Sequence, residues 1–219
     1  MTRWLKEHGL LVVNLGLFAG FLVGMTLTGW HVHNDDQLAH ESSPISLIAY
    51  LGSGDFGEAI FENWESEFLQ MGMYIVLTIF LFQRGSAESK PLGKRAPQDA
   101  DPRHAVAAGA PWPVRRGGWV LGLYEWSLSL LFLALFTASF VLHAVTGSRA
   151  YSAEQAEHGL PGASPIEYVT TSQFWFESFQ NWQSEFMVVA VIVVASVYLR
   201  QRGSPESKPV AAPHAETGD

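Results

Sequence analysis

The chain has 219 residues, of which 48% are hydrophobic and only 16% are charged, and it contains no cysteine. This composition is typical of a small membrane protein, and the missing cysteines exclude disulfides, thiol catalysis and cysteine-ligated metal centres. The net charge of -8 disfavours nucleic acid as a partner.

Four apolar segments follow one another along the chain, and each is expected to form a membrane helix. A bilayer requires about 20 mostly apolar residues per helix. Gly9–Gly29 and Trp119–Val145 meet this length, whereas Phe68–Phe82 and Phe186–Leu199 reach it through the sequences that precede them in helical phase. The first apolar segment is longer than that of a signal peptide, so we expect the protein to retain it.

Positive charge is unevenly distributed between these segments. Basic residues lie before the first segment, between the second and third, and after the fourth: Arg3, Lys6, Arg84, Lys90, Lys94, Arg95, Arg103, Arg115, Arg116, Arg200, Arg202 and Lys208. The other two connections are acidic and contain Arg149 as their only basic residue. The positive-inside rule therefore predicts that both termini and the central linker are cytoplasmic.

The two halves of the sequence are copies of one unit. They align without a gap from Leu5 against Leu123 to Pro91 against Pro209, an offset of 118 residues. Two nine-residue strings, QRGSAESKP at 83–91 and QRGSPESKP at 201–209, differ only at Ala87 and Pro205. We therefore predict an all-α integral membrane protein with four transmembrane helices, arranged as two tandem helix–loop–helix repeats of the same orientation.

This duplication predicts a chain of four parts. Residues 1–91 form the first two-helix membrane repeat and residues 119–209 form the second. Residues 92–118 are rich in Ala, Pro, Gly and charge, and we expect a flexible cytoplasmic linker there. Residues 210–219 have the same character and are predicted to be a disordered cytoplasmic tail.

The sequence FENWESEF in the first copy is matched by FQNWQSEF in the second. On a helical wheel the Asn, Ser and Glu of each block fall on one side and the aromatic residues on the other. The resulting polar set is Asn63, Ser66, Glu67, Asn181, Ser184 and Glu185.

This polar set has two interpretations. It is the amphipathic border of two membrane helices, or it is a polar or cation-binding site in which the two faces meet across a pseudo-two-fold axis. Glu62 and Glu65 become Gln180 and Gln183 in the second copy. Only Glu67 and Glu185 are therefore interpreted as the functional carboxylates.

Three histidines in the first acidic connection are weak candidates for a metal site. His31, His33 and His40 lie near Asp35 and Asp36, and imidazole with carboxylate suits a transition metal. A solvated acidic loop explains the same residues. No cofactor is predicted.

The duplicated nine-residue strings predict a second polar feature, at the cytoplasmic ends of the helices. Gly85 and Gly203 are expected to cap those ends in a left-handed conformation. The charged and hydroxyl residues around them are predicted to form a cytoplasmic collar that binds lipid phosphate, the other repeat or a partner protein: Arg84, Ser86, Glu88, Lys90, Arg202, Ser204, Glu206 and Lys208.

Small residues also mark one helix face. Gly16, Gly20 and Gly24 recur at every fourth position of the first segment. Such a stripe allows close contact between helices, within the monomer or between monomers.

The motifs NWQSEF and LRQRGSPESKP resemble those of an uncharacterised bacterial family of membrane proteins, a domain of unknown function. The resemblance covers both repeats and is closest over residues 174–210. It implies an integral membrane protein of bacteria, which places the chain in the inner membrane as a multi-pass protein, and it implies no activity or ligand.

No catalytic fingerprint occurs in the sequence, and we expect a protein that is not an enzyme. Its first predicted function is a membrane scaffold or interaction protein, whose partners are the lipid bilayer and either further copies of itself or another membrane protein. The alternatives are a small transporter or ion-conducting protein that uses Glu67 and Glu185, and an envelope metal-binding protein that uses His31, His33 and His40.

Overall fold

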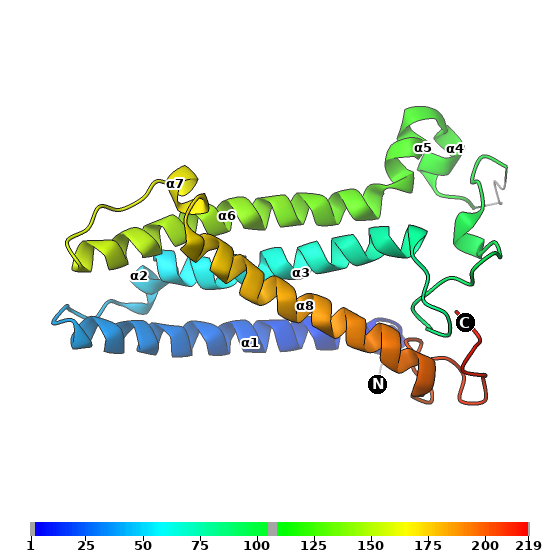
Figure 1. Cartoon of the computed structure of the whole chain (residues 1–219), viewed down its shortest axis with the longest axis horizontal. Helices are drawn as coiled ribbons and strands as arrows, with labels where there is room; N and C mark the ends of the chain where they lie inside the picture. The colour runs from blue at the N-terminus through cyan, green and yellow to red at the C-terminus, as the bar shows by residue number, and fades with distance from the viewer. Residues whose placement is uncertain (1–2, 105–108, 219) are drawn as a thin grey trace. The chain divides into compact units, whose positions relative to one another are not determined.

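The computed structural model describes residues 3–104 and 109–218, and these residues form helices and no strands. Parts of three predicted segments, namely residues 1–2 of the first repeat, 105–108 of the linker and Asp219 of the tail, lie outside the described residues. Figure 1 shows the elements: α1 (Arg3–Ala39), α2 (Leu47–Leu51), α3 (Gly54–Phe80), η1 (Pro97–Asp99), α4 (Trp112–Arg116), α5 (Gly118–Glu125), α6 (Ser127–Glu157), α7 (Pro165–Val169) and α8 (Ser172–Tyr198).

Three of the described helices, α1, α6 and α8, are long and apolar enough to cross a membrane. This number corrects the prediction of four. Helix α3 has the same length as α8, 27 residues. Its first half, however, contains Glu58, Glu62, Glu65 and Glu67. Each charge is costly in hydrocarbon, so the composition of α3 alone does not qualify it as a span.

The helix boundaries differ from the predicted ones at two further places. Helix α1 continues to Ala39, so His31 and His33, expected in a loop after Gly29, are helical, and His40 follows the end of the helix. The predicted segment Trp119–Val145 is divided between α5 and α6 at Trp126, whose φ of -108° and ψ of 4° end the first helix. The apolar stretch of α1 ends at Gly29 although the helix does not, and composition does not mark a break inside an apolar stretch, which explains both differences.

The structure divides into two compact units, each built from two stretches of chain. The first unit contains Met1–Ile60 and Leu142–Thr171, and its buried residues include Tyr50, His143 and Tyr168. The second unit contains Phe61–Val141 and Ser172–Asp219.

Two tyrosines organise the first unit. Tyr50 follows the cap of α2, where the Ser46 hydroxyl accepts a hydrogen bond from the Ala49 N–H. Its hydroxyl lies against Gly29, where a side chain would collide with it. Tyr168 of α7 lies against Gly147 in the same way, so each tyrosine packs on a glycine of a long helix.

The second unit is held by aromatic rings and by polar groups. Phe174 is fully buried, and its ring meets Phe140 edge-on at 5.2 Å between centroids. Glu65, Ser66, Ser86, Ser178 and Lys208 are also buried there. Buried polar groups are costly unless they are hydrogen-bonded, so the hydrogen-bond partners of these residues indicate where a functional site lies.

Candidate functional site

Glu65 of α3 is a fully buried carboxylate of the second unit, with 0% exposure. The Ser178 hydroxyl donates to its Oε1 at 2.8 Å, and the Trp182 indole N–H donates to the same oxygen at 3.3 Å. Both donors belong to α8, which is apolar enough to cross a membrane. These two donors, a hydroxyl and an indole, are both neutral.

Aromatic packing fixes the indole that reaches Glu65. The Trp182 ring meets Phe179 at 5.6 Å, Trp175 at 6.3 Å and Phe136 at 6.4 Å, all nearly edge-on. Rings in these orientations attract one another and restrict rotation. The N–H of Trp182 is therefore held in the direction of Glu65.

The predicted polar set is dispersed between buried and exposed positions. Ser66 is buried, Asn181 and Glu185 are half-buried, and Asn63, Glu67 and Ser184 are exposed. The hydroxyls of Ser66 and Ser184 donate to carbonyls of their own helices, at 2.7 and 2.8 Å. A shared site formed by Glu67 and Glu185 stays a prediction.

Sequence reasoning missed Glu65 because it required a carboxylate in both copies. The second copy has Gln183 at that position, and the structure buries the member that is not duplicated. A usable signal was present in the first copy alone. Glu58, Glu62 and Glu65 recur at helical spacing in α3, and carboxylates on one face before an apolar stretch indicate an inward-facing surface.

A second carboxylate is engaged in the first unit. The Tyr168 hydroxyl donates to Glu58 Oε1 at 2.9 Å, and the ring of the fully buried His143 meets the Tyr168 ring edge-on at 6.4 Å. A side chain at Gly147 would overlap both Tyr168 and Glu58. The glycine thus leaves room for the tyrosine to reach the carboxylate.

The three histidines proposed as metal ligands do not converge in the described part of the chain. His33 Nδ1 lies 2.5 Å from Asp55 Oδ2, whereas the His31 ring lies against Trp30, and His40 bonds to the Asp36 carbonyl in the last turn of α1. Beside the His33–Asp55 pair, burial raises the pKa of Tyr50, and the charge of Asp55 adds to this rise. The metal site stays a prediction.

The two copies of the nine-residue string have the same local hydrogen bonds. In the first, the Gln83 N–H donates to Ser89 Oγ at 3.0 Å and the Glu88 N–H donates to Ser86 Oγ at 3.1 Å. In the second, the equivalent bonds measure 2.9 and 3.2 Å. The serines therefore shape the same turn in both copies, which gives these positions of the duplicated string a structural role.

The glycines of these turns adopt the expected left-handed conformation, with φ of 85° at Gly85 and 86° at Gly203. Their expected place as helix caps is wrong. Helices α3 and α8 end at Phe80 and Tyr198, so each glycine belongs to the turn beyond the helix.

Several members of the predicted collar are bonded within the protein. Ser86 is fully buried and its hydroxyl lies 2.8 Å from that of Ser196. Glu88 accepts a hydrogen bond from Tyr74 at 3.0 Å, and Lys90 pairs with Asp99 at 2.6 Å. The remaining members differ in exposure: Arg84, Arg202 and Glu206 are exposed, Ser204 is half-buried, and Lys208 is buried.

The Lys208 ammonium is surrounded by the C-terminal tail. It donates to the carbonyls of Pro213, His214 and Glu216, at 3.3, 3.1 and 2.8 Å. Burial lowers the pKa of Lys208, as does the neighbouring charge of Arg200. The tail, for which the sequence predicts disorder, also bonds back to the first string, because the Gly85 N–H donates to Thr217 Oγ1 at 2.8 Å.

Neither the search of curated proteins nor that of solved structures found a match to this chain. A family model described as Domain of unknown function (DUF6766) matches residues 1–219. This match covers the apolar helices, the Glu65 site and both nine-residue strings, so the whole chain belongs to the DUF6766 family.

Proposed function

We propose that this protein is a non-enzymatic, multi-pass protein of the bacterial inner membrane that binds and passes a proton or a small monovalent cation. One observation carries the proposal, the complete burial of Glu65 between Ser178 and Trp182 of an apolar helix. An ionisable side chain inside a membrane bundle is costly and marks an ion or proton pathway by default. Glu65 thus takes the role that the sequence suggested for Glu67 and Glu185.

The chemistry of the site suits a proton or a small cation. A carboxyl oxygen can carry a proton, and a carboxylate oxygen can coordinate a hard cation. The two donors from α8, a hydroxyl and an indole, are neutral.

The arrangement we propose is two tandem repeats of the same orientation, with both termini cytoplasmic. Its support is the offset of 118 residues, which relates the bounds of α3 to those of α8 and the bounds of α2 to those of α7. Helix α3 crosses the bilayer in this arrangement despite its composition. Burial of Glu65 supports that inference, because a carboxylate bonded to α8 does not face lipid.

Flux through proteoliposomes tests this function. An imposed pH or cation gradient is expected to decay faster with the protein than without it, and Glu65→Gln is expected to slow that decay roughly tenfold, equivalent to about 1.4 kcal/mol. Glu67→Gln, an exposed carboxylate two residues away, is the matched control and should retain the flux. The proposal would be contradicted if both the pH gradient and the cation gradient decayed no faster in vesicles with the protein than in vesicles without it.

A membrane scaffold is the second candidate, and α1 favours it. This helix has no buried residue, and nothing in the described structure lies within 4 Å of a side chain added at Gly16, Gly20 or Gly24. The small-residue stripe is thus open for a partner helix. If Gly20→Ile abolishes an oligomer in mild detergent and flux is absent, the scaffold is the better description.

A further inference from the structure

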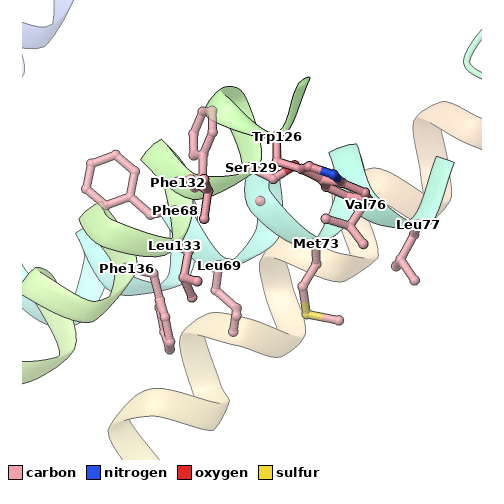
Figure 2. Close-up of a pocket in the computed structure, with 12 residues that line it drawn as sticks. Phe68, Leu69, Met73, Val76, Leu77, Trp126, Ser129, Phe132, Leu133 and Phe136 are labelled. Carbon is pink, nitrogen blue, oxygen red and sulfur yellow. The ribbon is translucent and has the colours of Figure 1, made fainter. Parts of the chain in front are cut away.

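An elongated apolar groove lies between α3 and the first three turns of α6, inside the second unit (Figure 2). Its volume is about 360 Å³, within the range of roughly 300–1,000 Å³ that holds small ligands. From α3 come Phe68, Leu69, Gly72, Met73, Val76 and Leu77, and from α6 and the residue before it come Trp126, Ser129, Leu130, Phe132, Leu133 and Phe136.

The lining determines the chemistry of the occupant. Ser129 and Trp126 are the two lining residues with polar side-chain atoms, and every other side chain is a hydrocarbon or a thioether. Water gains too few hydrogen bonds in such a space to occupy it well. A charged or polyhydroxylated ligand would lose its hydration without replacement. The groove therefore suits an apolar occupant.

The dimensions determine the shape of that occupant. From Phe68 to Leu77 the groove follows nine steps of α3, which at ~1.5 Å per residue is a length of ~14 Å. A thin flexible chain fits a groove of this length and volume.

The two ends of the groove differ. Figure 2 places Trp126 near Val76 and Leu77 at one end, and Phe136 near Leu69 at the other. Glu125, the neighbour of Trp126, pairs with Arg103 at 3.7 Å, so charged groups are found at this end. Tryptophan beside charged residues is typical of the membrane–water interface. The opposite end continues along α6, which is apolar enough to cross a membrane.

We propose that this groove binds one acyl chain of a bilayer phospholipid, with the headgroup end of the chain at Trp126. The bilayer supplies the ligand at high local concentration, and the apolar lining recognises its methylene groups. The inference rests on the proposed crossing of the bilayer by α3, but it does not involve Glu65, so lipid labelling and ion flux can fail separately.

Photolabelling tests the proposal with the whole chain. The protein is reconstituted in phosphatidylethanolamine–phosphatidylglycerol vesicles that contain a phospholipid with a diazirine in the middle of one acyl chain. Adducts are then mapped by mass spectrometry. We expect adducts at Met73 and Leu133 to exceed those at Val191 and Leu15, the residues that occupy the equivalent positions of the other copy.

Filling the groove provides the control. Val76→Trp is expected to reduce the adducts at Leu133 roughly tenfold, whereas Val194→Trp, at the equivalent exposed position of α8, should leave them unchanged. Leu133→Trp, read out at Met73, is a second filling variant if the first does not fold.

Three results would overturn the proposal. Equal labelling at groove and equivalent positions would mean that lipid contacts the helices without selection. Labelling by a free diazirine fatty acid but not by the phospholipid would mean that the groove binds free fatty acids and not bilayer phospholipid. Crosslinks from this face to a second protein chain, without lipid adducts, would make the groove an interface between copies.

Discussion

Gly147 illustrates how one residue controls a buried polar contact. A Cβ atom added there would lie 2.6 Å from the Tyr168 ring and 2.7 Å from Glu58 Oε1. Both distances are shorter than a van der Waals contact, and the Tyr168 ring is fully buried in a closely packed interior.

We predict that Gly147→Ala lowers the free energy of unfolding by about 1–3 kcal/mol, the usual effect of overpacking. Gly20→Ala is the matched control, because nothing lies within 4 Å of its added Cβ and alanine is the better helix former. Thermal unfolding in detergent measures both variants. Equal melting temperatures would show that Tyr168 does not pack as described.

Glu167 gives a pH dependence with a defined sign. The Ser164 hydroxyl, and to a smaller extent the Ser164 N–H, hold the pKa of Glu167 below its ordinary value. A lowered pKa in the folded state stabilises the protein above the ordinary pKa, and this stabilisation is lost as the pH falls through the lowered one.

We therefore expect the wild type to lose more thermal stability than Glu167→Gln between about pH 6 and about pH 3. The equivalent position of the first copy holds Ala49, so the cap of α2 has no carboxylate to titrate there. Parallel curves for wild type and variant would exclude this contribution.

The turns formed by residues 83–91 and 201–209 have the same local hydrogen bonds but differ in their tertiary contacts. Ser86 and Ser204 each accept a hydrogen bond from the N–H two residues later. Ser86 also bonds to Ser196 and is fully buried, whereas Ser204 is half-buried. The two serines are therefore expected to contribute different amounts to the free energy of unfolding.

We predict that Ser86→Ala costs about 1–3 kcal/mol of stability, because it leaves the Ser196 hydroxyl and the Glu88 N–H without this partner in a buried place. Ser204→Ala should cost about 1 kcal/mol or less, since water replaces its bond. Chemical denaturation of both variants measures the difference. If the two losses are equal, contacts outside the turn do not matter.

Across the whole molecule, the crossing of the bilayer by α3 decides the topology. The chain has no cysteine, so single cysteines can be labelled without a background. We predict that Ser42→Cys reacts with a membrane-impermeant maleimide added outside the cell, and that Lys94→Cys reacts only after the membrane is permeabilised.

Residues 42 and 94 flank α3 and are both exposed, so a difference in their labelling reports the helix between them. Labelling of both from outside would mean that α3 does not cross. In that case the protein would have the three membrane spans that composition supports.

Composition and local backbone preference suffice to predict the all-helical class, the long apolar helices and the left-handed conformation of Gly85 and Gly203. The identity of the buried carboxylate depends instead on packing between distant parts of the chain. Burial of Glu65 depends on Ser178 and Trp182, more than a hundred residues away in the chain. A comparison of the two copies favours duplicated residues, whereas a buried site requires complementary ones, so a carboxylate and its donors need not recur. The same reason explains Lys208, whose three carbonyl partners come from a tail that the sequence marks only as polar.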